Sequence, residues 1–396
     1  MKKGTFLFIA SVILTLGMCQ CAKTTNDKQA TEASLSTEAH ELDSICHSLF
    51  PADEPGAAVL VMRGDSIVFN EGYGLADLET KTPISDSTFF NIASVSKQFT
   101  AVAILQLAEE GKLSLNDAVA QYMPYRWALW KEVRLRHLLS HSSGVPDCRG
   151  GIPREEKIHG TDSLAIAYLD TLTTLRFSPG TAYEYINPTF VLCGKLVEKV
   201  SGEPFSEYMQ RHVFAPAGME AYYIADNEDI IPHMAHGYEY ADVTDMPEER
   251  TAESPSKEKK NWYEYDYGEE TFFATRPDGG LYTSVRQFVR WEQALRNHAV
   301  LSESYLQDAW SPHTQVSGSP WSSYQNRPNT WYGYGWFIEP ATDSTKTVIY
   351  HTGDNGGFKI LAARYPEDDA LVLVFANRAD WDRYALMQKI EKIYCF

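Results

Sequence analysis

The sequence is poor in cysteine and in positive charge, and each shortage removes a class of protein from consideration. Only 6 of its 396 residues are cysteines, and those beyond the N-terminal segment have the spacing of neither a zinc site nor a redox pair. Lys and Arg number 35 against 53 Asp and Glu, a formal net charge of -18, and no long basic cluster offsets it. This charge repels nucleic acid and anionic surfaces. We therefore expect no nucleic-acid partner.

Apolar and aromatic residues are abundant enough for a folded chain. Hydrophobic residues make up 44% and aromatic residues 13% of the sequence, which is far too rich for a disordered protein. The length permits one large domain or a domain with an embedded subdomain. We find no internal repeat.

The first 21 residues have the pattern of a secretory signal peptide. Two lysines precede an apolar run, Phe6–Met18, that is too short to span a bilayer comfortably. Residues 22–40 are polar and have no sustained apolar period, which predicts a flexible tether between this segment and the folded body. We therefore expect an exported protein.

A cysteine at the end of the apolar run suggests a lipid anchor. The segment Leu16–Cys19 resembles the lipobox of bacterial lipoproteins, which implies cleavage before Cys19 and lipidation of that residue. Met18 departs from the small residue usual at its position, and a plain secretory signal cut nearby is the alternative. The expected location is the cell envelope, with the membrane contacted through the N-terminal lipid.

Four cysteines lie outside this segment: Cys46, Cys148, Cys193 and Cys395. A bridge between the first and the last could form in an oxidising compartment if the two terminal helices pack together. A buried free thiol is the alternative for each of the four.

From residue 41 onward the apolar pattern predicts one mixed domain, residues 41–396. Two strand-like runs, Ala57–Met62 and Ser66–Phe69, form a hairpin pattern, and more strand-like runs lie near the C-terminus before a final helix, Asp382–Tyr394. Between about 111 and 330 the pattern is mainly helical. The expected fold is α+β, with an antiparallel sheet built from both termini, flanked by helices, and an inserted mainly helical subdomain.

A serine and a lysine three residues apart open a strongly apolar helix. Residues at this spacing share a helix face, so the Lys97 amine can reach the Ser94 hydroxyl. Serine is a weak nucleophile at its free pKa and needs such a proton acceptor. Burial at the helix N-terminus would push the lysine toward its neutral, basic form. Taken alone, the pattern is more often an N-cap serine with a snorkelling lysine.

Two later segments carry residues with matching chemistry. Tyr185 and Asn187 precede a helix that starts at Pro188, a loop position suited to a cleft. Tyrosine can shuttle a proton, and an amide can orient a lysine and bind a substrate carbonyl. His351 and Gly353 end a predicted strand, where glycine lets a substrate approach the backbone. Taken alone, Tyr185 could equally be an aromatic residue that packs in the core, and His351 an ordinary histidine in a turn.

Together, in this order and at these intervals, the three segments resemble the serine beta-lactamase and penicillin-binding protein superfamily, most closely its class C and DD-carboxypeptidase-like branch. The likeness runs from about Pro55 to Asn377. Its blocks are Asn91–Lys97, His137–Gly144, Phe177–Gly180, Tyr185–Asn187, Pro216–Met219, Gly279–Leu281, Tyr332–Trp336 and His351–Gly353.

The resemblance implies the catalytic roles. Ser94 would be the acylated nucleophile and Lys97 its activating base. Tyr185 would relay protons to the leaving group and to the hydrolytic water, while Asn187 would hold Lys97 and the substrate amide. No metal or organic cofactor is implied.

It also implies the walls of the site. His351 and Gly353 would line the side opposite the helix, and the backbone N–H groups of Ser94 and Asp354 would form the oxyanion hole. Class C beta-lactamases carry a lysine where this chain has His351, whereas peptidases and esterases of the branch often carry histidine. Without a permanent positive charge, capture of a carboxylated lactam at neutral pH is weaker.

The expected function is therefore an exported serine hydrolase that forms an acyl-enzyme at Ser94 and acts on a D-amino-acid peptide of cell-wall type, an amide or an ester. One alternative is a true class C-like beta-lactamase. The other is a non-catalytic peptidoglycan-binding or sensor module that retains the fold. The partner would be a small-molecule or peptide substrate, and the expected state is a monomer.

Overall fold

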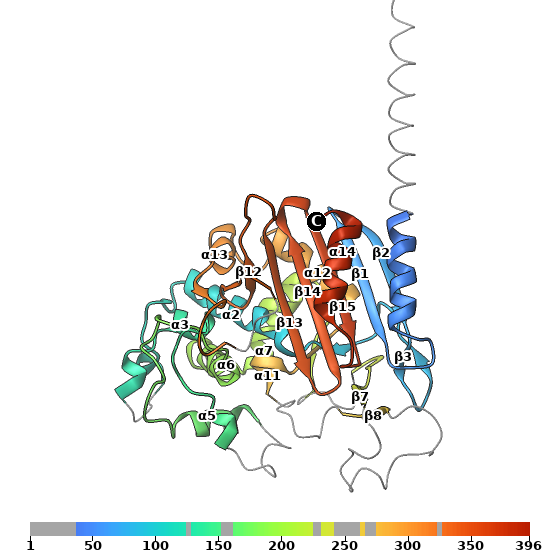
Figure 1. The fold of residues 1–396 in the computed structure, drawn as a ribbon. Coiled ribbons are helices and arrows are strands. Elements are labelled where there is room, and N and C mark those ends of the chain that lie inside the picture. Colours follow the sequence, from blue (N-terminus) through green and yellow to red (C-terminus); the bar gives the residue numbers. More distant parts are fainter. Residues whose placement is uncertain are drawn as a thin grey trace, which may run out of the picture.

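The computed structural model describes residues 37–123, 128–151, 161–224, 231–240, 262–265, 275–322 and 327–396. The described residues form a central sheet of 8 strands, every neighbouring pair antiparallel, in the order β10-β11-β12-β13-β14-β15-β1-β2 (Figure 1). The strands are β1 (Ala57–Arg63), β2 (Ser66–Tyr73), β10 (Thr314–Gln315), β11 (Trp331–Tyr332), β12 (Phe337–Glu339), β13 (Val348–Asn355), β14 (Phe358–Tyr365) and β15 (Ala370–Ala376). An antiparallel sheet drawn from both ends of the chain is confirmed.

The sheet separates two hydrophobic cores because successive side chains of a strand point to opposite faces. In β1 the even-numbered residues Ala58, Leu60 and Met62 enter one core. The odd-numbered Ala57 and Val59 enter the other, and β1 is buried along almost its whole length. The sequence of β1 is therefore apolar at successive positions rather than at every second one.

Helices cover both faces of this sheet. The N-terminal helix, residues 37–49, and α14 (Arg383–Tyr394) contribute side chains to the same core on one face (Figure 1). The other core takes side chains from the helices that follow β5, chiefly α2, α6 and α12. The helices between the sheet's two halves are α2 (Lys97–Glu109), α3 (Leu135–Leu139), α5 (Asp162–Leu169), α6 (Asn187–Ser201), α7 (Phe205–Tyr208), α8 (Ala215–Ala217), α11 (Arg276–Gly279), α12 (Val285–Arg296) and α13 (Glu303–Ala309).

Three small sheets accompany them. They are β3 (Leu75–Asp77) with β4 (Thr82–Pro83), β5 (Phe90–Asn91) with β9 (Leu281–Thr283) and β6 (Tyr222–Tyr223), and β7 (Tyr238–Tyr240) with β8 (Trp262–Glu264). The second of these matters most for function, because β5 leads directly into the turn that carries Ser94.

Two predicted boundaries shift. The N-terminal helix begins at residue 37, so the last four residues of the expected tether are helical. His351 lies in the middle of β13 rather than at a strand end, because pairing with β14 continues to Asn355. The partner is the next strand, β14, and the tight turn at Gly356 and Gly357 lets the pairing continue to the end of this hairpin.

The four cysteines of the described chain are free, so the Cys46–Cys395 bridge does not form. Cys46 points into the core between the N-terminal helix and the sheet. Cys395 follows the last turn of α14 in a left-handed conformation with φ +56° and is exposed, so it is not the buried thiol that was expected. Cys148 and Cys193 are buried as free thiols.

The predicted signal peptide, residues 1–21, the lipidation site Cys19 and most of the predicted tether lie outside the described residues. Within the described part of the chain, no helix has the length and apolarity required to cross a membrane.

A buried carboxylate ties α12 to the sheet. Glu292 is 2% exposed and accepts charge-assisted hydrogen bonds from Arg296 at 2.7 Å and Arg364 at 2.6 Å. Arg296 in turn donates to the Gly64 carbonyl in the β1–β2 turn at 2.9 Å. One carboxylate therefore joins the inserted helices to two parts of the sheet.

We predict that Glu292→Gln lowers the free energy of unfolding by about 3 kcal/mol, because it removes the buried charge that the partly buried guanidinium groups of Arg296 and Arg364 share. Arg296 keeps its second ion pair, with Asp369. Urea denaturation measures the effect.

The matched control is Glu110→Gln, which removes an exposed ion pair with Lys112 and costs at most about 1 kcal/mol. Equal effects of the two substitutions would contradict the assignment of Glu292 as a structural centre.

Candidate active site

Ser94 lies on a tight turn between β5 and α2. The 3-10 turn Ala93–Ser96 carries it, and Ala93 adopts the left-handed region with φ +47°. This costs free energy for any residue with a β-carbon. The Ala93 N–H donates to the side-chain oxygen of Asn91 at 2.9 Å, which holds the turn. Ser94 is partly exposed, whereas its neighbours on either side are buried.

The amine of Lys97 is buried against Ser94. Its side chain is 0% exposed, and Nζ donates to Ser94 Oγ at 2.9 Å and to the main-chain oxygen of Asp278 at 2.7 Å. Burial lowers the pKa of Lys97 to about 7, an effect that the negative charge of Asp278 opposes. The amine is therefore available as a proton acceptor near neutral pH.

Tyr185 faces the same amine from the loop before α6. The centre of its ring lies 5.0 Å from Lys97 Nζ. The ring packs against His141, with centroids 4.2 Å apart, and stacks on Phe337 with centroids 6.3 Å apart. Aromatic contacts on both sides fix the orientation of the phenol. The structure thus brings Ser94, Lys97 and Tyr185 together.

Asn187 is the first residue of α6 and is partly buried. Its side-chain oxygen is buried and has no hydrogen-bond partner among the described residues. The two acceptors of the Lys97 amine are Ser94 and Asp278, so no hydrogen bond joins Asn187 to Lys97 in this structure. Its predicted role as holder of Lys97 and of the substrate amide stays a prediction.

His351 lies on β13 on the side of the site but offers it no charge. It is 1% exposed, its Nδ1 is 2.6 Å from the Thr352 main-chain oxygen, and its Nε2 is 2.9 Å from the Tyr332 hydroxyl. A carbonyl oxygen only accepts, so Nδ1 carries the proton and Nε2 accepts from the tyrosine. Burial, together with the nearby Lys97, lowers the pKa of His351 to about 3. The ring is neutral at neutral pH.

Gly353 brings β13 into close contact with the Ser94 turn. A β-carbon at this position would lie 2.5 Å from the Ile92 main-chain oxygen, 2.9 Å from Ala93 Cβ and 3.2 Å from the Ser94 nitrogen. Only glycine permits this approach. β12 pairs with β13 only as far as Tyr350, which leaves the strand edge beside Ser94 without a partner strand among the described residues.

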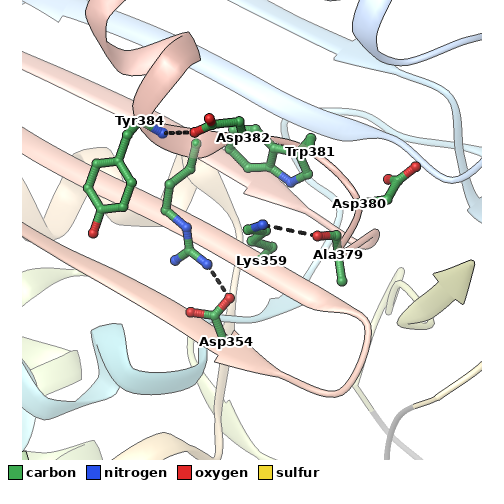
Figure 2. Close-up of a pocket in the computed structure, with 8 residues that line it drawn as sticks. Asp354, Lys359, Ala379, Asp380, Trp381, Asp382 and Tyr384 are labelled. Carbon is green, nitrogen blue, oxygen red and sulfur yellow. Dashed lines mark hydrogen bonds and ion pairs between the residues drawn. The ribbon is translucent and has the colours of Figure 1, made fainter. Parts of the chain in front are cut away.

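The side chain of Asp354 lines a charged hollow beside the start of α14 (Figure 2). Its carboxylate is paired there with Arg383. The same guanidinium, 4% exposed, donates at 3.1 Å to the main-chain oxygens of Gly353 and Ile360. Arg383 therefore holds the end of the β13–β14 hairpin from the far face of the sheet. The predicted role of the Asp354 N–H in the oxyanion hole stays a prediction.

Sequence reasoning missed three residues of this site: Asp278, Tyr332 and His141. Asp278 immediately precedes the Gly279–Leu281 block, and Tyr332 is the first residue of the Tyr332–Trp336 block. Their place in or next to these blocks was the one sequence signal that pointed to the site. His141 lies in the His137–Gly144 block, to which no catalytic role was assigned. It is buried, its Nδ1 is 3.2 Å from the Ile186 nitrogen, and its ring lies on Tyr185.

The family model for Beta-lactamase matches residues 48–392 of this chain. The chain belongs to the beta-lactamase family. Penicillin-binding protein 4* of Bacillus subtilis is 25% identical over 89% of this chain and 75% of its own length. Protein flp of Staphylococcus aureus (strain MW2) is 26% identical over 85% of this chain, which spans 62% of that relative.

A solved structure shares the fold of this beta-lactamase-family chain. The D-amino acid amidase of Ochrobactrum anthropi SV3, in complex with D-phenylalanine, superposes with a TM-score of 0.70, covers 91% of this chain and 98% of its own, and is 20% identical. The chain is thus a serine hydrolase with the beta-lactamase fold, and the predicted resemblance is confirmed.

We predict that Gly353→Ala slows the reaction of Ser94 with a fluorophosphonate on the order of a hundredfold, since the new methyl group forces the strand or the serine turn to move by a sizeable fraction of an ångström. The rate of labelling, followed by intact-protein mass, measures it. Gly279→Ala is the control, because its β-carbon would meet Ala93 at an ordinary 3.8 Å. A folded Gly353→Ala variant that labels at the wild-type rate would contradict this reading of the site.

Proposed function

We propose that this protein forms an acyl-enzyme at Ser94 and hydrolyses it. One observation carries the proposal: a fully buried lysine amine, with its pKa lowered to about 7, lies 2.9 Å from the Ser94 oxygen. A serine hydroxyl needs such a neighbour to act as a nucleophile. The partial positive charge at the start of α2 adds roughly 0.3–1 kcal/mol of stabilisation to negative charge on that oxygen.

In the first half-reaction, neutral Lys97 takes the hydroxyl proton as Ser94 Oγ bonds to the acyl carbon. The carbonyl electrons move onto its oxygen, where the N–H groups of Ser94 and Asp354 stabilise the charge. Collapse of this intermediate breaks the bond to the amine or alcohol, which leaves with a proton delivered by Tyr185. Tyr185 recovers a proton from Lys97, whose Nζ lies 5.0 Å from the centre of its ring.

In the second half-reaction, water attacks the acyl-serine. Tyr185 and Lys97 take its proton and return one to the serine oxygen, which restores the hydroxyl and releases the acid. Asn187, with a buried side-chain oxygen that has no partner in the described chain, is suited to accept a hydrogen bond from the substrate amide. The groups named supply every proton that the two steps require.

The charge of the site favours an acyl donor without a carboxylate. His351 is neutral and both of its ring nitrogens are engaged, so this position of β13 provides no cation to bind an anionic group. We therefore propose a D-amino-acid peptide of cell-wall type cleaved at a bond away from its terminal carboxylate, an amide or an ester as substrate, ahead of a beta-lactam. The structural likeness to a D-amino acid amidase that binds D-phenylalanine supports this choice.

We also propose that the enzyme is exported and lipid-anchored at the cell envelope. The charged and apolar pattern of residues 1–21, with Cys19 in a lipobox-like segment, supports export and anchoring. The folded body is proposed to act as a monomer on its small-molecule or peptide substrate.

We predict that incubation with a fluorophosphonate or a penicillin probe adds one covalent adduct per chain, located on Ser94 by peptide mass mapping. Ser94→Ala removes the nucleophile and abolishes the adduct. The variant should fold normally, because the substitution removes only one oxygen atom. Hydrolysis of a reactive ester should be lost together with the adduct.

Wild-type protein that forms no adduct with either probe would overturn the acyl-enzyme proposal. If such protein still bound peptidoglycan peptides, and Ser94→Ala bound them equally well, the chain would instead be a binding or sensor module that keeps the fold.

We predict that kcat/KM for neutral D-alanyl amides and p-nitrophenyl esters exceeds that for a chromogenic cephalosporin, whose carboxylate finds no cation on β13. His351→Lys should narrow this gap by raising cephalosporin turnover relative to the esters. His351→Gln, neutral and also able to accept from Tyr332, is the control. A wild-type preference for the cephalosporin would favour the alternative of a true class C-like beta-lactamase.

A further inference from the structure

The short helix α11 lies under the catalytic turn and supplies two main-chain oxygens to side chains of α2. The Thr100 hydroxyl donates to the Pro277 oxygen at 2.7 Å, and Lys97 Nζ donates to the Asp278 oxygen at 2.7 Å. The second contact holds the Lys97 amine from the side opposite its contact with Ser94. The position of Asp278 therefore determines where the amine of Lys97 points.

The side chain of Asp278 is itself buried, and its negative charge acts on that amine. Asp278 is 5% exposed, and its Oδ1 has no hydrogen-bond partner among the described residues. Burial raises the pKa of this carboxyl group, and the positive charges of Lys97 and Arg149 and a hydrogen bond with Thr275 oppose the rise. An incompletely hydrogen-bonded buried carboxyl group costs stability. Its presence next to a reacting amine therefore points to function.

The other charges near Lys97 are already balanced. The groups that act on it or face it are Asp278 from α11, Asp147 and Arg149 from the turn after α3, His141, Tyr185 from the loop before α6, and His351 from β13. Asp147 and Arg149 form an ion pair at 2.8 Å. Both histidines have a lowered pKa because they are buried, and they are neutral. Asp278 is the remaining carboxyl group of this set.

We propose that Asp278 is a positioning residue for the reaction: its main-chain oxygen aims the Lys97 amine at Ser94, and its buried carboxylate balances the positive charge that Lys97 acquires with the serine proton. This inference rests on the proposed acyl-enzyme function. During acylation the proton leaves Ser94 Oγ and binds Lys97 Nζ, so an ammonium forms in a site that excludes water. A carboxylate close by lowers the energy of that state.

The test is the pH dependence of Ser94 labelling by a fluorophosphonate in the full chain. The wild-type rate should rise with pH through a midpoint near 7, the pKa of Lys97, because only the neutral amine accepts the proton. Asp278→Asn keeps the shape and the main-chain oxygen but removes the charge. Its midpoint should fall by about one pH unit, since a nearby negative charge no longer favours the ammonium. Its plateau rate should also fall.

The matched control is Asp368→Asn, which removes one negative charge from an ion pair with Lys346. Asp368 follows the end of β14, whereas Gly353 pairs with Ile360 near the start of that strand. The midpoint of this control should stay at the wild-type value. If the wild type does not label at all, the proposed function fails. If the wild type labels and Asp278→Asn shows an unmoved or higher midpoint, the inference about Asp278 is overturned.

Folding of the variants is followed by thermal unfolding. If Asp278→Asn does not fold, the smaller Asp278→Ser takes its place, with the same predicted shift of the midpoint. Failure of both variants to fold would also overturn the inference, because the carboxylate would then serve the fold rather than the reaction.

Discussion

The burial of one amine determines the chemistry of this molecule. Lys97 is 0% exposed and has two oxygen neighbours, Ser94 Oγ and the Asp278 main-chain oxygen. An ammonium in such a place loses its hydration, so the neutral form becomes accessible near pH 7. Every other feature of the site either keeps water from this amine or fixes the atoms around it. The aromatic rings of Tyr185 and Phe190 lie 5.0 and 5.7 Å from its nitrogen.

The fold makes this burial possible by joining three distant parts of the chain. The sheet supplies β13, which approaches the serine turn closely because Gly353 has no side chain. The helical part supplies α6, with Phe190, and α11, with the Asp278 main-chain oxygen, and these close the other sides of the amine. Arg383 donates to the Gly353 main-chain oxygen from the far face of the sheet, so the strand beside Ser94 is held from behind. Stability and function thus depend on the same contacts.

The sequence predicted the parts of the site that are local. Ser94 and Lys97 are three residues apart, and helix periodicity alone brings them together. The hairpin and the final helix were likewise expected from local patterns. The contact between Lys97 and Asp278 joins residues 181 positions apart, and no local pattern encodes it. The orientation of Asp354 depends on the register of β13 against β14, which a single sequence does not reveal.

The most direct test of this account is an NMR titration of the Lys97 side chain in the folded protein, with isotope-labelled lysine and the Lys97→Met variant to assign the signal. The account predicts that Lys97 titrates near pH 7, far below the ordinary value of 10.5. A Lys97 that stays protonated up to about pH 10 would contradict it, because the serine would then have no base beside it at neutral pH.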